Sequence, residues 1–205
     1  MKPCLLILTV VLYLTGCRSY PPEINEGRVV YPKYQISFET PPADSWHLSK
    51  RLPPRIIPRS DDYRSAVGAF SKIIFVNDEQ DGVIALEVSK SFINAAKQPR
   101  QNIKNYLDTG FSDRAESIKT SVFFSDYRYD FSVPHIDKTP ALISREKFNM
   151  TSYGKTYNCE INSYVYTIND DDTCVLRFIF WSAADTYFPN KATLYKLLKT
   201  LKRES

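Results

Sequence analysis

The sequence contains few of the residues that catalytic and phosphate-binding motifs require. It has 6 glycines and 2 histidines among 205 residues. Neither HExxH nor GxSxG occurs, and the glycine content is too low to predict loops that hold phosphate groups. We interpret His47 and His135 as surface or packing residues, so we expect no catalytic residue and no cofactor.

The chain also lacks a strong charge of either sign. Its 27 Lys and Arg residues against 23 Asp and Glu residues give a formal net charge of +4. Nucleic-acid binding requires a concentrated basic surface, which this balance does not predict. With 14 Tyr and 12 Phe, the composition instead favours β-strands.

The long apolar runs of membrane-spanning helices are absent as well. The one candidate follows Lys2 and extends from Leu5 to Leu14, which is short of the roughly 20 residues that a bilayer requires. It has the form of a secretory signal peptide over residues 1–16. Because Gly16 precedes Cys17, the order Leu-Thr-Gly-Cys resembles the bacterial lipobox, in which the cysteine receives a diacylglyceryl group. The alternative is a buried or bridged cysteine near an uncleaved leader.

A lipid on Cys17 would hold the protein to a membrane without a spanning helix, since two or three fatty chains give stable attachment. Lipoproteins retained at the inner membrane commonly carry Asp after the cysteine. Arg18 therefore favours the outer membrane, facing the periplasm. Residues 17–33 mix proline, glycine and charge without apolar periodicity, and we expect a flexible tether there. Residues 34–205 are then one domain.

Period-two alternation of apolar residues predicts most of this domain to be β-strand. The expected strands are residues 34–38, 46–48, 70–76, 83–89, 123–131, 142–148, 157–168 and 173–182. Two helices are expected, over residues 99–118 and from Pro189 to the C-terminus, where Leu194, Leu197, Leu198 and Leu201 form one stripe. Short turns join most strands, so the predicted fold is α+β, with an antiparallel sheet of about six to eight strands flanked by helices.

Cys159 and Cys174 lie in one predicted hairpin. If Ile168 pairs with Thr173, the two thiols share a face but stand roughly 25 Å apart. A disulfide requires Cα atoms within about 7 Å, so this register forbids one. A different register leaves a bridge open, because the cell envelope is oxidising. Neither the spacing of these cysteines nor the acidic turn Asp170–Asp172 matches a metal-binding motif, so we expect no metal.

Three features together resemble the PsbP/DcrB-like superfamily. They are the opening YQISFETPPADSW, a central helix after a β-hairpin, and the ending LRFIFWSAADTYFPNKATLYKLLKTL. The likeness covers most of residues 34–203. It implies an antiparallel sheet between helical layers, in an α/β/α sandwich. It also implies a binding module, because the superfamily includes photosystem assembly factors, a nuclear-transport factor and bacterial envelope lipoproteins.

A proline-rich basic segment after residue 49 is the candidate contact surface. Exposed arginine and tyrosine side chains are frequent anchors of protein interfaces. The candidate residues are Lys50, Arg51, Arg55, Arg59, Tyr63 and Arg64. The alternative is an ordinary basic surface loop.

Two further patterns have open interpretations. The aromatic row Phe123, Tyr127, Tyr129 and Phe131 is either core or the lining of a ligand groove. The cations around the C-terminal leucine stripe, from Lys191 to Arg203, are either a solvated helix face or a contact with an anionic membrane.

The expected function is that of a non-enzymatic, lipid-anchored protein of the cell envelope. It would bind a protein partner and assist or stabilise a membrane-associated complex. One alternative is a carrier of a small or lipidic ligand between sheet and helix. Another is a hydrolase that uses His47 or His135.

Overall fold

The structure is a computed structural model that describes residues 22–54, 71–90, 119–132, 135–136, 139–140, 142–167 and 173–204, with a few residues between 105 and 116. Within these ranges, no helix combines the length and the apolar character needed to cross a membrane.

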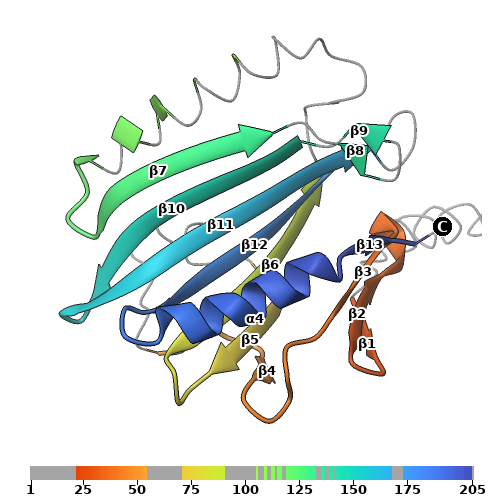
Figure 1. Ribbon diagram of the computed structural model, residues 1–205, viewed down its shortest axis with the longest axis horizontal. Coiled ribbons are helices and arrows are strands. Elements are labelled where there is room, and N and C mark those ends of the chain that lie inside the picture. Colours follow the sequence, from red (N-terminus) through yellow and green to blue (C-terminus); the bar gives the residue numbers. More distant parts are fainter. Residues whose placement is uncertain are drawn as a thin grey trace, which may run out of the picture.

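A seven-stranded sheet forms the body of the molecule (Figure 1). Its order is β4-β5-β6-β12-β11-β10-β7, and all neighbouring strands are antiparallel. The strands are β4 (His47–Ser49), β5 (Ile73–Asn77), β6 (Gly82–Lys90), β7 (Phe124–Ser132), β10 (Leu142–Ser152), β11 (Lys155–Thr167) and β12 (Thr173–Ala183). The predicted antiparallel sheet of six to eight strands is confirmed.

A second, four-stranded sheet has the order β1-β2-β3-β13. Its strands are β1 (Glu23–Asn25), β2 (Arg28–Tyr31), β3 (Ile36–Glu39) and β13 (Lys202–Arg203), and a short 3-10 helix, η1 (Pro32–Tyr34), connects β2 to β3. This sheet therefore contains both the first and the last described strand of the chain. A separate hairpin pairs β8 (His135–Ile136) with β9 (Thr139–Pro140).

Helix α4 (Tyr187–Lys199) and the second sheet cover one face of the main sheet. Leu194 and Leu197 are buried there with aromatic residues of β12. Phe38 of β3 meets Phe178 edge to face, with ring centroids 5.2 Å apart. Burying these side chains joins the helix and both sheets in one core, since removal of apolar surface from water is the main favourable term in folding.

The opposite face of the main sheet carries a second apolar cluster around Trp181 and Tyr157, whose rings are 5.5 Å apart. The described side chains that pack on it include Phe123, Phe124 and Tyr127. Helical flanking agrees with the prediction in part. Helix α4 covers one face, and the described residues between 105 and 119 are helical. The rest of the predicted helix 99–118 lies outside the described residues.

The predicted tether over residues 17–33 is wrong for its second half. Glu26 and Gly27 have φ values of 49° and 75°, and this left-handed pair forms a two-residue turn between β1 and β2. After the turn, Val29 and Tyr31 are buried in the core. Two apolar residues at period two therefore decide the structure of a segment whose charges and prolines are typical of a linker.

The register of the β11–β12 hairpin also differs from the prediction. Thr167, not Ile168, pairs with Thr173, so Cys159 lies opposite Trp181 and Cys174 opposite Tyr166. A shift of one residue moves a side chain to the other face of a sheet. Consequently, the two cysteines lie on opposite faces, and both are free and buried.

A charged groove beside the C-terminal helix

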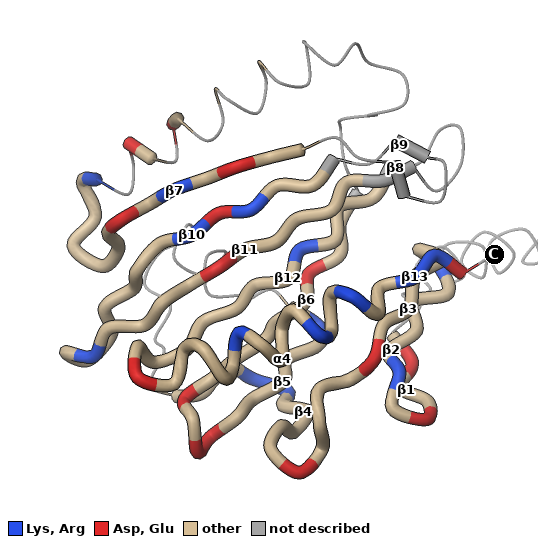
Figure 2. The backbone as a smooth tube through the Cα atoms, in the orientation of Figure 1, with Lys and Arg blue, Asp and Glu red and all other residues tan. Residues whose placement is uncertain are grey.

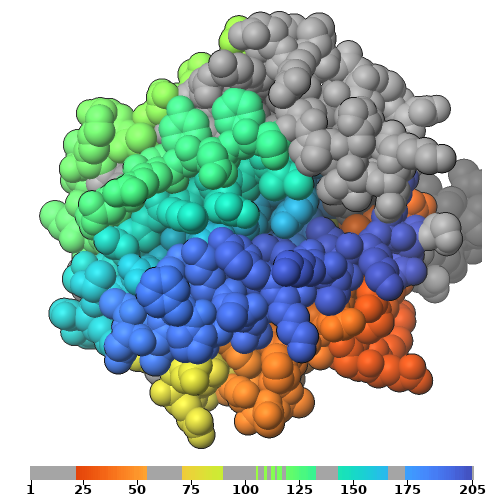
Figure 3. Space-filling view, viewed as in Figure 1, coloured from red at the N-terminus to blue at the C-terminus, as the bar shows by residue number. Residues whose placement is uncertain are grey.

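A groove of about 460 Å³ lies between the N-terminal turn of α4 and the open part of the main sheet. Helix α4 crosses the centre of the sheet and leaves β10 and β7 uncovered by it, and side chains of these strands are visible between β7 and α4 (Figure 3). Residues that line the groove include Asp126 and Arg128 of β7, Lys147 of β10, Asn158 of β11, and Tyr187 and Phe188 of α4. Acidic and basic residues alternate along β7 and β10 (Figure 2).

A fully buried carboxylate, Glu160 of β11, lies beside this groove. Arg145 Nε approaches its Oε1 at 3.3 Å, and Lys191 Nζ approaches its Oε2 at 3.5 Å. The hydroxyl of Tyr195 and the amide of Asn162 donate hydrogen bonds to Oε1 at 2.9 and 3.1 Å. A buried charge is tolerated only when it is paired and hydrogen-bonded. This set of contacts therefore links α4 to β10 and β11.

Tyr187, Lys191 and Tyr195 form one stripe of α4 at a spacing of four residues. The Lys191 ammonium lies 5.0 and 5.1 Å from the centroids of the two tyrosine rings. Burial, followed by the charge of Glu160, raises the pKa of Tyr187 to about 12 and also raises the pKa of Tyr195. Both phenols are protonated at neutral pH, so their hydroxyl groups donate hydrogen bonds to the Glu160 carboxylate.

Arg128 and Lys147 face each other directly across the β7–β10 pair. On the other side, Lys147 is opposite Glu160, whose oxygens already contact Arg145 and Lys191. In the part of the chain that the structure describes, neither Arg128 nor Lys147 has a side-chain hydrogen bond or ion pair. Like charges directly opposite each other on neighbouring strands are destabilising. The floor of the groove thus holds two positive charges that form no ion pair with a described residue.

A bulge in β7 brings these two cations into register. Asp126 has a φ of 55°, and the β7–β10 register shifts between Lys147 and Asn149. The amide of Asn149 donates to Asp126 Oδ2 at 2.7 Å, which holds the bulged residue. An extra residue in one strand reverses which face the following side chains occupy. Tyr127 therefore turns to the opposite face, where its hydroxyl donates to Glu146 Oε2 at 2.7 Å.

The predicted aromatic row lies on that opposite face. Phe123 and Tyr127 pack against the second core cluster, as the core interpretation expects. Tyr129 is 36% exposed. The groove described here is built from the other face of β7, so its lining does not include this row.

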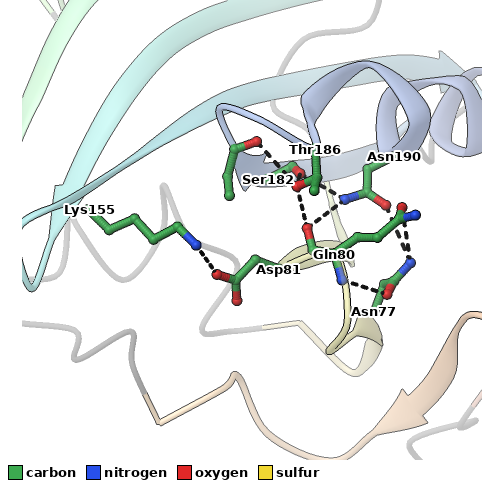
Figure 4. A network of polar contacts seen from close by, with 8 residues as sticks. Asn77, Gln80, Asp81, Lys155, Ser182, Thr186 and Asn190 are labelled. Atoms are coloured by element: carbon green, nitrogen blue, oxygen red, sulfur yellow. Dashed lines mark hydrogen bonds and ion pairs between the residues drawn. The ribbon is translucent and has the colours of Figure 1, made fainter.

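A buried polar network fixes the N-terminal end of α4, which forms one wall of the groove (Figure 4). The Asn190 amide donates to Ser182 Oγ at 2.8 Å and to the Gln80 carbonyl at 3.0 Å. The Thr186 hydroxyl donates to the same carbonyl. These bonds tie the helix to β12 and to the β5–β6 turn, so the position of Phe188 is set by buried groups.

Two of the residues predicted as a contact surface, Lys50 and Arg51, lie away from this groove. Lys50 and Arg51 are exposed just after β4, at the opposite edge of the sheet from β7. Arg55, Arg59, Tyr63 and Arg64 lie outside the described residues, and so does Cys17. Their roles stay predictions.

His47 is exposed in β4, with its Nε2 3.7 Å from Asp78 Oδ2. His135 lies in β8, and its side chain is outside the described ones. Among the residues that the structure describes, no cluster of three His, Cys, Asp or Glu side chains could hold a metal ion.

Sequence reasoning missed Glu160, Arg128 and Lys147. The stripe Tyr187, Lys191 and Tyr195 was a usable signal, because a cation between two tyrosines on a helix face indicates a polar contact. Nothing local could reveal its partner in β11 or the bulge at Asp126, since both depend on strand register.

No protein-family model matches the chain, and no curated protein sequence matches it. Solved structures similar to it include LpqN of Mycobacterium tuberculosis, described as involved in cell envelope biogenesis. The identity is 12%, the match covers 88% of each chain, and the TM-score is 0.46. Another is cyanobacterial PsbP (CyanoP) of Synechocystis sp. PCC 6803, at 11% identity, with 86% of this chain and 91% of that chain covered and a TM-score of 0.47.

Proposed function

We propose that this protein is a lipid-anchored binding protein of the cell envelope, which holds a protein partner at a membrane and stabilises a membrane-associated complex. The groove beside α4 is the observation that supports binding. Its wall includes Phe188, which is 78% exposed, and its floor includes Arg128 and Lys147. Exposed aromatic and arginine side chains are the usual anchors of protein interfaces.

A lipid on Cys17 would supply the location. Strand β1 begins at Glu23, so residues 18–22 are the whole link between the lipid and the folded domain. At roughly 3.5 Å per residue, this link spans no more than about 20 Å. The domain would work next to the bilayer surface. In this proposal the protein has no enzymatic activity of its own.

The location is tested with Cys17→Ser in a bacterial host. We expect the variant to move from the membrane fraction to the soluble fraction, because it lacks the fatty chains. Cys159→Ser is the matched control, since its thiol is buried in the core, and it should stay at the membrane. Mass spectrometry should find the lipid on residue 17 of the wild type. Unchanged membrane association of Cys17→Ser would refute the anchor.

The binding role is tested by affinity purification from crosslinked membranes. Two charge-reversal sets separate the two candidate surfaces. One set is Arg128→Glu with Lys147→Glu in the groove, and the other is Arg51→Glu with Arg55→Glu and Arg59→Glu in the basic segment. We expect one protein to copurify with the wild type and to be lost from one set. A partner retained by both sets would remove both surfaces from consideration, and no partner at all would contradict the proposal.

The alternative function, a carrier of a small or lipidic ligand, is also supported by the groove, because it lies between sheet and helix and has space for a small molecule. Organic extraction of the purified protein, followed by mass spectrometry, should then release one compound in a stoichiometric amount. If the extracts contain no such compound, the carrier function is contradicted and the protein-binding function is retained.

A further inference from the structure

We propose that Arg128 and Lys147 bind the carboxylate or phosphate group of a ligand whose apolar part packs against Phe188. This inference rests on the proposed binding function and names the chemistry of the ligand. It is carried by the alignment of the two cations and by the exposed ring beside them.

Among the residues that the structure describes, neither cation takes part in a hydrogen bond or an ion pair through its side chain. They are directly opposite each other on β7 and β10, where like charges repel. The buried anion opposite Lys147 in β11 is Glu160, and its two oxygens already receive two cations, two tyrosine hydroxyls and one amide. An anion placed between Arg128 and Lys147 would remove the repulsion.

The one acidic side chain among the described lining residues does not fill this role. Asp126 accepts hydrogen bonds from Asn149 and Ser125 through the same oxygen, Oδ2, and it makes no ion pair within the described part of the chain. Guanidinium and ammonium groups together match a carboxylate or a phosphate, which accept several charge-assisted hydrogen bonds.

The apolar half of the ligand is indicated by α4. Phe188 is 78% exposed, and its ring contacts that of Tyr187 at 5.5 Å between centroids. Exposure of a phenylalanine in the first turn of a helix has no benefit for folding. The buried network at Asn190 holds the backbone of this turn in place, so binding would need to fix only the side-chain rotamer of Phe188.

The test uses the full-length protein in a neutral maltoside detergent and measures binding by calorimetry. Three probes are used. Phenyl phosphate carries both the anionic group and the ring, inorganic phosphate carries the anionic group alone, and benzyl alcohol carries the ring alone. We expect phenyl phosphate to bind at least tenfold more tightly than either of the others. Equal binding of benzyl alcohol would overturn the anion site, and equal binding of inorganic phosphate would overturn the role of Phe188.

Arg128→Gln and Lys147→Gln should each weaken phenyl phosphate binding by about tenfold or more, the loss expected for a hydrogen bond to a charged group. Lys196→Gln, on the exposed side of α4, is the matched control and should bind as the wild type does. Thermal denaturation adds a second readout. Removing either of two repelling cations should leave the midpoint unchanged or higher. A lower midpoint would mean that the pair is structural, and would overturn the proposal.

The source of the anionic group is separated by competition. Phosphatidylglycerol vesicles that displace phenyl phosphate, when phosphatidylcholine vesicles do not, identify a lipid headgroup. Displacement by soluble phosphate esters alone identifies a free metabolite. Either result supports the anion site, whereas displacement by phosphatidylcholine vesicles as well would contradict charge recognition. These assays require no protein partner, so their outcome is independent of the copurification test.

Discussion

Gly82 at the start of β6 lies directly against Asn190 of α4. A Cβ atom built at Gly82 would stand 2.7 Å from Asn190 Nδ2 and 3.0 Å from the Trp46 ring. The absence of a side chain at residue 82 is therefore what lets the β5–β6 turn meet the helix.

Gly82→Ala should destabilise the fold by about 1–3 kcal/mol, the usual range for overpacking a core. The methyl group would push Asn190 away from the Gln80 carbonyl and Ser182. Urea denaturation followed by circular dichroism measures the effect. Ser89→Ala, at an exposed position of the same strand, should be nearly neutral. Equal stability of both variants would show that the helix can shift without cost.

Glu160→Leu should lower the free energy of unfolding by about 3 kcal/mol, because Arg145 and Lys191 would lose the carboxylate that compensates them. Glu116→Leu is the control. It breaks the Glu116–Lys119 pair, in which both side chains are 71% exposed, and should cost less than about 0.5 kcal/mol. Similar effects in the two variants would mean that the buried cluster adds no more than a surface pair.

Stability should fall as the pH rises from about 10 to about 12. Burial and then Glu160 raise the pKa of Tyr187 from 10.0 to about 12. Between these values the unfolded chain loses the phenolic proton and the folded chain keeps it, so the unfolded state is favoured. Below pH 10 both states are protonated and the contribution is fully present. Tyr187→Phe should reduce the dependence, and Tyr153→Phe, at a 69% exposed site, should not. Identical pH profiles for Tyr187→Phe and the wild type would contradict this assignment.

Cys159 and Cys174 should react with a thiol reagent only after unfolding. Both are buried on opposite faces of the sheet, and burial raises the pKa of the Cys159 thiol. Thiolate is the reactive form, so the folded protein should be inert at neutral pH. The double variant Cys4→Ser with Cys17→Ser, isolated from the envelope and denatured without reductant, should show two reactive thiols, those of Cys159 and Cys174. If these two thiols are not labelled after unfolding, Cys159 and Cys174 form a disulfide, and the strand register differs from the one described.

Strand positions could be predicted from the sequence where apolar runs flank a polar turn, as in β5 and β6, because burial requires apolar side chains at these positions. The leucine stripe of α4 was predictable for the same reason, and Leu194 and Leu197 are buried. Both patterns are local, and each needs only a few neighbouring residues.

Properties that depend on pairing between distant strands could not be predicted in this way. The face of Cys174 changes with a single residue of turn length, and the pairing of β13 with β3 joins residues 165 positions apart. The opposition of Arg128 and Lys147 also depends on a bulge in β7. In the structure the bulge is marked by the positive φ of Asp126, which the sequence pattern does not reveal. The groove is made from these relationships, which is why the sequence pointed to a different surface.

The second sheet holds the chain at both ends, since β1 opens it and β13 closes it. If Cys17 carries the proposed lipid, a fluorophore on Lys202 would lie at the anchored end of the domain, whereas one on Tyr153, in the turn between β10 and β11, would lie at the far tip. Quenching by spin-labelled phospholipids could thus report the tilt of the anchored domain from two dyes alone.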